Sequence, residues 1–313
     1  MNKSEFNVAP LRFVMHHPLH GNALGTLSAQ SLTEINFLSM PNTSVLAQEY
    51  DMFVGALRQH TEVTFLQNLL ANETDYRQDC TSNPNLMFCR DSAVTLPWNP
   101  SRFIPARLAL AGRKNESGIM GKALVKLGLQ PLLSFDDDEY LEGGDVLPAM
   151  HDGKRLLLIG FGNRTSKAAA MKIAMKLIPE HVDQVIGLSH DPDLLHLDTG
   201  FTVLPNQVMF AAAGMFRAGF MFDSERRLHD VDPISTAQKL GFRIITCDKQ
   251  DAILHERCNM LPLGNGKFMA FDMPEKITAE LEKAAGISIM SVNGKELAKA
   301  AGGVHCLTRP VYI

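Results

Sequence analysis

The chain has 313 residues, of which 45% are hydrophobic and 20% charged, a composition typical of a globular protein with a large apolar core. Its 34 acidic and 30 basic residues give a net charge of −4 without any long run of lysine or arginine, so we expect no nucleic-acid partner. The longest apolar stretches are too short and too often interrupted to cross a membrane, so we expect no membrane association.

In chain order, the apolar pattern predicts a strand at 11–17, a helix at 44–60, strands at 62–67 and 92–98, and a helix at 116–130. It continues with a strand at 154–162, a helix at 164–179, a hairpin at 201–212, helix then strand at 233–248, a hairpin at 259–272, and helix then strand at 274–293. Pairs of strands are thus followed by a helix and a further strand several times over. This alternation predicts an α/β fold, for which a doubly wound sheet is the default.

Cysteine usage and the N-terminal residues indicate the compartment. Five cysteines, an odd number spread along the chain, do not form the pattern of a disulfide framework. The N-terminus contains no apolar segment of the kind that a signal peptide requires. We therefore expect a cytoplasmic protein, and the lack of low-complexity tracts or long linkers predicts a single domain over residues 1–313.

The glycine-rich turn at 159–166 is the one stretch that resembles a nucleotide-binding loop. It follows a predicted strand and opens a helix, but its glycine spacing is incomplete for a dinucleotide fingerprint. It also lacks the Gly-Lys-Ser/Thr sequence of a phosphate-binding loop. The sequence therefore predicts no nucleotide cofactor.

Polar residues interrupt apolar runs at three places. Asn85 and Asp91 bracket "NLMFCRD", which also fits a strand that ends in a capped turn. Glu142 lies in "LEGGDVLP", where a turn explains the glycines but not the carboxylate on either side. His196 and Asp198 alternate with leucines, and on a strand both would point to the same face.

"AGGVHCLTRP" at 301–310 combines two glycines with Cys306. A lone cysteine is most often a small buried apolar residue, but a nearby base can convert it into a nucleophile. His305 is its sequence neighbour and, on an extended backbone, would point to the opposite face. The two glycines are interpreted as permitting a tight bend through positive φ angles.

A metal site is the competing interpretation of the histidine-containing stretch. Several potential ligands lie close together in sequence at 190–198: His190, Asp191, Asp193, His196 and Asp198. Strand geometry would not direct all five at one point, and a helical His-Glu-x-x-His pair is absent. We expect no metal, and keep a zinc hydrolase as a remote alternative.

Taken in order, the motifs Asn-x-x-Phe-x-Arg-Asp, Glu-Gly-Gly-Asp, His-Leu-Asp-Thr and Gly-Gly-x-x-Cys resemble the guanidine-modifying superfamily. Its members include arginine deiminases, dimethylarginine dimethylaminohydrolases, arginine dihydrolases and amidinotransferases. The motifs run from residue 85 to residue 306, about two thirds of the chain. The resemblance implies a pentein-type α/β propeller of five ββαβ modules with pseudo-fivefold symmetry, and no cofactor.

The resemblance also implies roles for the residues of these motifs. Cys306 would attack the guanidinium carbon, His196 would act as general acid and then general base, and Glu142 would orient His196. The residues implied to bind substrate are Asp91 and Asp198 for the guanidinium with Asn85 beside them, and Arg164 and Arg113 for an α-carboxylate. The expected partner is a small arginine-like guanidino compound, and a homodimer is kept as an option.

The substrate is the least determined part of the prediction. In the family, Asp at position 198 accompanies unsubstituted guanidines, which favours free arginine and a citrulline product. The length of 313 residues instead resembles the dimethylarginine hydrolase branch, since arginine deiminases usually carry an extra helical domain. An arginine dihydrolase that yields ornithine, an amidinotransferase and a non-catalytic guanidine binder remain alternatives.

Overall fold

The computed structural model describes residues 8–28 and 31–313, so the prediction about the N-terminus falls partly outside the described residues. Its strands are β1 (Arg12–Met15), β2 (Glu62–Phe65), β3 (Ala93–Leu96), β4 (Asn99–Pro105), β5 (Gln130–Pro131), β6 (Val146–His151), β7 (Lys154–Phe161), β8 (Gln184–His190), β9 (Phe201–Leu204), β10 (Val208–Ala212), β11 (Phe216–Phe222), β12 (Leu228–Val231), β13 (Arg243–Cys247), β14 (Leu261–Gly264), β15 (Lys267–Phe271), β16 (Ser288–Val292) and β17 (Arg309–Val311).

The α-helices alternate with these strands and are α1 (Thr43–Leu57), α2 (Leu66–Leu70), α3 (Thr74–Ser82), α4 (Glu116–Lys126), α5 (Lys167–Leu177), α6 (Leu197–Gly200), α7 (Pro233–Lys239), α8 (Lys249–His255), α9 (Glu275–Ala285) and α10 (Lys295–Ala298). Within the described ranges, no helix combines the length and the apolarity needed to cross a membrane.

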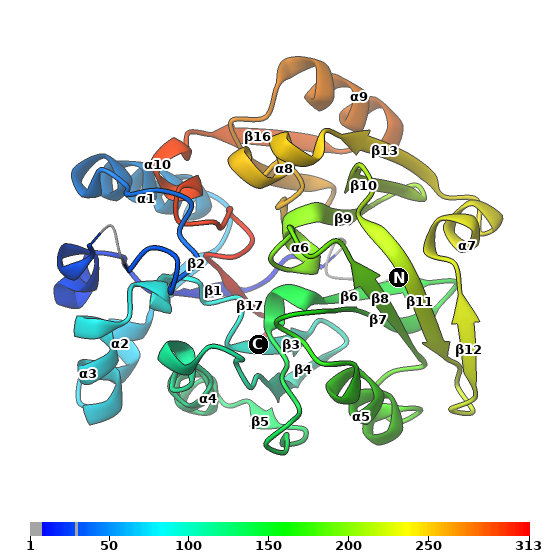
Figure 1. Cartoon of the computed structure of the whole chain (residues 1–313), viewed down its shortest axis with the longest axis horizontal. Coiled ribbons are helices and arrows are strands. Elements are labelled where there is room, and N and C mark those ends of the chain that lie inside the picture. Colours follow the sequence, from blue (N-terminus) through cyan, green and yellow to red (C-terminus); the bar gives the residue numbers. More distant parts are fainter. Residues whose placement is uncertain (1–7, 29–30) are drawn as a thin grey trace.

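One strand topology occurs five times. In each sheet two strands pair antiparallel and a third lies parallel to the second, as in β3–β4–β5, β6–β7–β8, β9–β10–β13, β14–β15–β16 and β17–β1–β2. A helix precedes each third strand, and these five helices, α1, α4, α5, α7 and α9, lie at the periphery around the sheets (Figure 1). The predicted five ββαβ modules are therefore present.

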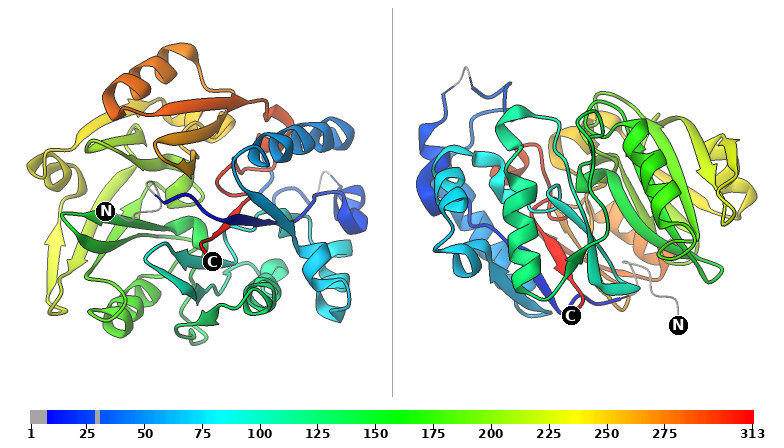
Figure 2. Two further views of the ribbon diagram at one scale, coloured as in Figure 1. Left: turned by 180° about the vertical axis from the view of Figure 1, so that it is seen from behind. Right: turned by 90° about the horizontal axis from the view of Figure 1, so that it is seen from below.

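Two features modify this fivefold plan. The β11–β12 hairpin leaves the third module and extends the second sheet, giving it five strands in the order β12-β11-β8-β7-β6. The β17–β1–β2 sheet joins the two ends of the chain, because β17 pairs antiparallel with β1 (Figure 2). The ring of modules is thus closed by segments about 300 residues apart in sequence.

Local sequence explains why the peripheral helices form. In α5, alanine-rich sequence favours the helix, and Ser166 caps it by accepting the N–H of Ala169 at 3.1 Å. Ile173 and Leu177 are buried in the same apolar cluster as Leu157 of β7. Each module therefore covers its own sheet, leaving the central ends of strands and loops to form the site.

Candidate active site

A narrow cavity, hereafter the inner cavity, is lined by residues of three of the four sequence motifs, and the motif that carries Glu142 contacts it through His196. Of the predicted site residues, it is lined by Asn85, Asp91, Arg113, Arg164, His196 and Cys306. Ile35 and Asn36 also line it, and the side chain of Asn85 donates a hydrogen bond to the carbonyl of Ile35 at 3.2 Å. The segment around Ile35 therefore contributes to the wall of a closed site.

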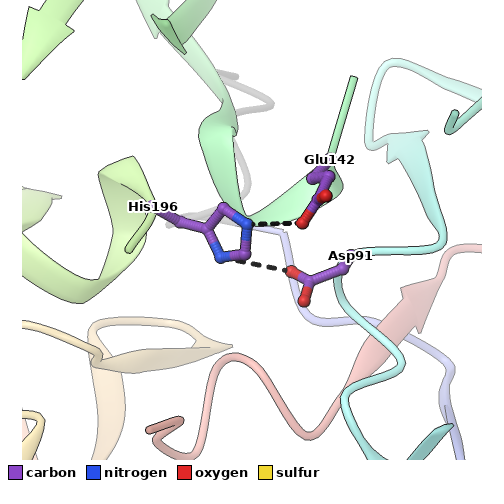
Figure 3. Close-up of side chains that lie close together, drawn as sticks. All are labelled: Asp91, Glu142 and His196. Carbon is purple, nitrogen blue, oxygen red and sulfur yellow. Dashed lines mark hydrogen bonds and ion pairs between the residues drawn. The ribbon is translucent and has the colours of Figure 1, made fainter. Parts of the chain in front are cut away.

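His196 lies between two carboxylates (Figure 3). Its Nε2 lies 2.8 Å from Oε2 of Glu142, and its Nδ1 lies 3.6 Å from Oδ1 of Asp91. The predicted contact between Glu142 and His196 is thus present, while Oδ1 of Asp91 makes no hydrogen bond. An unpaired buried carboxylate oxygen favours a ligand that donates N–H groups.

The carboxylates determine the charge of this histidine. Burial by itself lowers the pKa of His196, but Asp91, the hydrogen bond to Glu142 and the charge of Asp145 outweigh burial and raise the pKa to about 9. Burial raises the pKa of Glu142, yet His196, Arg164 and Arg113 together hold it well below its ordinary value. At neutral pH the pair is therefore a histidinium and a carboxylate.

Cys306 is buried beside Asp198 and Asn259. Its Sγ lies 3.7 Å from Oδ2 of Asp198 and accepts a hydrogen bond from Nδ2 of Asn259 at 3.0 Å. The backbone N–H of Cys306 donates to Oδ1 of Asn259 at 3.2 Å. The side chain of Asn259 therefore binds both the backbone and the side chain of Cys306.

The surroundings of Cys306 favour its neutral thiol form. Burial raises its pKa well above the ordinary value, and the charges of Asp198, Glu256 and Asp91 raise it further. A cation placed between Asp91 and Asp198 would offset these charges. The site therefore favours a thiolate only once a cationic ligand is present.

Glycines in the Glu-Gly-Gly-Asp motif allow close approach of neighbouring backbone and side chains. A Cβ on Gly143 would lie 2.1 Å from the carbonyl oxygen of Arg90, and one on Gly144 would lie 2.9 Å from Nδ1 of His196. Glu142 itself is anchored because its backbone N–H donates to the Thr165 hydroxyl at 3.1 Å. Only glycine at these positions leaves room for the histidine against the motif.

The glycines before Cys306 are required for a similar reason. This corrects the expectation that they adopt positive φ angles. Neither Gly302 nor Gly303 has positive φ, whereas Ala301 does, at 60°. A Cβ on Gly302 would lie 2.3 Å from Cε1 of Phe88, and one on Gly303 would lie 2.5 Å from Oδ1 of Asn259. Tight packing, and not backbone conformation, therefore requires glycine here.

Backbone hydrogen bonds join the motifs to one another. The N–H of Arg90 donates to the carbonyl of Cys306 at 3.0 Å, and that of Gly143 donates to the carbonyl of Asp91 at 2.8 Å. Oδ1 of Asp145 accepts the N–H of Leu197 at 2.8 Å. The positions of nucleophile, carboxylates and histidine are consequently coupled through the main chain.

The stretch containing His196 and Asp198 is not a strand, contrary to the expectation from alternation. His196 is the N-cap of α6, and Asp198 lies in the first turn of this four-residue helix. The bond from Asp145 to the N–H of Leu197 explains the difference, because it anchors a helix start that apolar alternation cannot show. The helix separates the two side chains, so His196 faces Glu142 while Asp198 faces Cys306.

His305 also differs from its predicted role as an outward-facing neighbour. It is buried, and its Nδ1 lies 2.7 Å from Oδ2 of Asp198. The backbone at this point is a turn, not an extended segment, because the N–H of Leu307 donates to the carbonyl of Gly303. His305 therefore occupies one oxygen of the carboxylate beside the cysteine.

Both arginines predicted to bind an α-carboxylate are paired with protein carboxylates. Arg113 contacts Asp91 at 2.9 Å and Glu116 at 2.7 Å through two donors. Arg164 donates through Nε to Glu142 at 3.0 Å, while its Nη2 lies 2.8 Å from Oε2 of Glu142 without making a hydrogen bond. Both guanidinium charges are thus already paired with protein carboxylates. Carboxylate recognition by these arginines stays a prediction.

Among residues 8–28 and 31–313, one group of three side chains has ligand atoms close enough for a metal ion: Asp91, Glu142 and His196. Arg113 and Arg164 donate to its two carboxylates, and a cation there would be repelled by both guanidinium groups. The predicted competitor at 190–198 is not assembled, since Asp191 and Asp193 instead bind Lys249. The contacts favour a histidinium held between two carboxylates over a metal site.

Asn259, Glu116 and Glu256 are site residues that the motifs did not reveal. Asn259 is the first residue of the predicted hairpin at 259–272 and precedes β14, and no local pattern marks its side chain as a partner of Cys306. Glu116 begins α4, where an acidic first turn is common for reasons of helix stability alone. Their contacts depend on segments that meet only in the folded molecule.

Comparison with known proteins agrees with this geometry. The arginine deiminase family model matches residues 80–312. The arginine deiminase of Mycobacterium marinum is 27% identical over 252 residues, covering 73% of this chain and 60% of the relative. That of Levilactobacillus brevis is 26% identical over 276 residues, covering 77% of this chain and 64% of the relative.

Two solved structures show the same fold over nearly the whole chain. The product-bound N-terminal domain of ArgZ, an arginine dihydrolase from cyanobacteria, has a TM-score of 0.73 at 17% identity and covers 96% of this chain and 97% of that one. A dimethylarginine dimethylaminohydrolase with an S-methyl-L-thiocitrulline adduct has a TM-score of 0.68 at 15% identity, covering 96% and 99%.

The fivefold ββαβ arrangement and these neighbours define the fold class as the pentein propeller. Within that class, the family model extends over most of the sequence, and the chain belongs to the arginine deiminase family. The chain spans less than two thirds of the length of the curated relatives described above.

Proposed function

We propose that this protein is a cysteine-dependent hydrolase that cleaves a guanidinium C–N bond of arginine or a close derivative, giving citrulline and ammonia. The observation that carries the proposal is one narrow cavity lined by Cys306, by His196 with its partner Glu142, and by Asp91, whose Oδ1 makes no hydrogen bond. A guanidinium fits this cavity because its planar edge can donate two N–H bonds to a carboxylate.

The first half of the reaction forms a covalent intermediate. Binding of the guanidinium beside Asp91 and Asp198 lowers the pKa of Cys306, and the thiol proton passes to solvent. The thiolate attacks the guanidinium carbon, forming a C–S bond, and the leaving nitrogen takes a proton from histidinium His196 as its C–N bond breaks. The products of this half are ammonia and a thiouronium on Cys306.

The second half returns the enzyme to its starting state. Neutral His196 takes a proton from water, and the hydroxide adds to the thiouronium carbon. The C–S bond then breaks, the electron pair returns to sulfur, and the remaining proton on the oxygen passes to the thiolate, giving the neutral urea group of citrulline and the starting thiol. Glu142 keeps His196 oriented and favours its protonated form throughout.

The proposal is tested with Cys306→Ser and by mass spectrometry of products from arginine, methylated arginines, agmatine and guanidinoacetate. We expect wild-type protein to release citrulline from arginine, and the variant to lose turnover by at least about 10³-fold while still binding substrate. Unchanged turnover in the variant would contradict cysteine catalysis. Ornithine as the product would identify a dihydrolase, and stoichiometric zinc with chelator-sensitive activity would favour a metal mechanism.

A further inference from the structure

A second, larger cavity adjoins the inner cavity. This outer cavity, of about 420 Å³, shares Asn36, Leu195 and Ala301 with the inner one. Because three residues line both spaces, a substrate whose guanidinium reaches Cys306 would extend its other end into the outer cavity. The lining of the outer cavity therefore bears on which groups that end can carry.

The charges facing the outer cavity are all negative. Among the described residues that line it, the charged side chains are Asp193 and Glu256, and none is lysine, arginine or histidine. Asp193 is largely exposed and already paired with Lys249 at 2.7 Å. Glu256 is thus the carboxylate of this cavity that remains available to a ligand.

Glu256 is buried without compensation. It is 3% exposed, and its Oε2 has no hydrogen-bond partner among the described residues. It follows α8, which contacts α6 and α10 near the centre of the ring (Figure 1). A buried carboxylate without a partner costs folding free energy. A cationic ligand that donated N–H groups to Glu256 would supply the missing hydrogen bonds, and this would contribute to its binding free energy.

Glu256 is also close to the reacting groups. Its charge acts on Asp198, His196 and Cys306, and its backbone carbonyl accepts the N–H of Asn259 at 3.0 Å. Arg113 and Arg164, by contrast, are already neutralised by carboxylates in the inner cavity. Burial and the charge of Asp198 raise the pKa of Glu256 well above its ordinary value, so a cationic group placed beside it would favour the ionised carboxylate.

We infer that Glu256 forms a subsite for an ammonium group, so that substrates carry an amine in addition to the guanidinium. The inference rests on the proposed function and narrows its substrate class to compounds with two positive charges, a guanidinium in the inner cavity and an ammonium in the outer cavity. The ammonium can be the α-amino group of arginine or the primary amine of agmatine. A guanidino acid without an amine gains nothing from Glu256.

The test compares Glu256→Gln with Asp251→Asn, which removes a carboxylate from α8 that pairs with Arg257 outside both cavities. Dissociation constants for arginine, agmatine and 4-guanidinobutanoate are measured by calorimetry in a Cys306→Ser background, where no turnover is needed. We expect Glu256→Gln to weaken arginine and agmatine by about 10- to 100-fold and to leave 4-guanidinobutanoate within about twofold. Asp251→Asn leaves all three unchanged.

Equal weakening of all three ligands, or no weakening of the two amines, would overturn the subsite. Glu256→Asp keeps the charge and should restore part of the preference for amines, while thermal melting shows whether each variant is folded. KM and kcat in the active protein separate the two proposals. Binding that depends on the amine, without any turnover, would support the ammonium subsite and contradict the proposed hydrolase. Turnover that depends on Cys306 but is unchanged by Glu256→Gln would support the hydrolase and contradict the subsite.

Discussion

At the scale of single residues, the proposed reaction needs a positive charge on His196 and a negative charge on Cys306. The protein's own carboxylates favour the first charge and disfavour the second. The carboxylates that keep His196 protonated also raise the pKa of the cysteine thiol. A cationic substrate between Asp91 and Asp198 relieves the second effect. In the proposed mechanism the thiolate is therefore formed only where substrate is bound, which limits its unproductive reactions.

The pKa of His196 predicts how activity and stability depend on pH. It rises from 6.5 to about 9 on folding, so its contribution to stability is complete below pH 6.5 and is lost as pH rises through about 9. The full contribution is about 3 kcal/mol at 1.36 kcal/mol per pKa unit. Since His196 must donate a proton, kcat/KM should also fall above about pH 9.

Urea unfolding of wild type and His196→Gln between pH 6 and pH 10 measures this contribution. Because the variant keeps every other titrating group, we expect the difference in unfolding free energy between the two proteins to shrink as pH rises. Glu142 does not disturb the comparison, as its pKa is held far below this range. A constant difference across these pH values would show that His196 is not a histidinium in the folded protein.

At the scale of elements, short turns and not the long helices position the chemistry. The turn that carries Cys306 packs against Asn259 and Phe88 so closely that its two glycines have no room for a methyl group. The four-residue helix α6 is likewise fixed by Asp145 from another motif. Such segments have little stability alone, so their geometry depends on the elements that hold them.

Gly303→Ala tests this dependence. Its Cβ would lie 2.5 Å from Oδ1 of Asn259, so Asn259 must shift and lose its hold on Cys306. We expect kcat to fall by about tenfold or more, with a loss of about 1–3 kcal/mol in unfolding free energy.

Gly55→Ala is the matched control, because no atom lies within 4 Å of its Cβ position on the exposed face of α1. It should keep full activity and stabilise the helix by about 1 kcal/mol. Wild-type kcat in Gly303→Ala would show that Asn259 does not position the nucleophile.

At the scale of the whole molecule, five sheets of one topology form a ring whose loops meet at the site. The ring closes through β1 and β17, and the hydroxyl of Thr95 in β3 donates to the carbonyl of Pro310 in β17 at 2.7 Å. Cys306 lies three residues before β17. Closure of the ring and placement of the nucleophile are therefore one structural event.

Hydrogen exchange checks this coupling. If the closing sheet unfolds only with the whole ring, amides of β1 and β17 should exchange within about tenfold of the rate in β7 and β8. The edge strand β12, which is mostly exposed and pairs only with β11, serves as the internal control and should exchange much faster. Fast exchange in β17 would show that the cysteine turn opens independently.

The regular elements and the principal site residues could be predicted because their signals are local. Apolar periodicity predicted helix α1 and the β9–β10 hairpin, and motif order predicted that His196 and Glu142 would meet. Periodicity failed at His196 and Asp198, since a hydrogen bond from the distant Asp145 begins the helix there.

The sequence by itself determined which residue types the site contains: a cysteine, a histidine and several carboxylates in a fixed order along one α/β chain. Only the tertiary structure decided how their charges are shared, pairing Arg113 and Arg164 with carboxylates and leaving Glu256 and one oxygen of Asp91 without partners. The reason is physical, since pairing and desolvation depend on which distant segments meet, and no local pattern records those meetings.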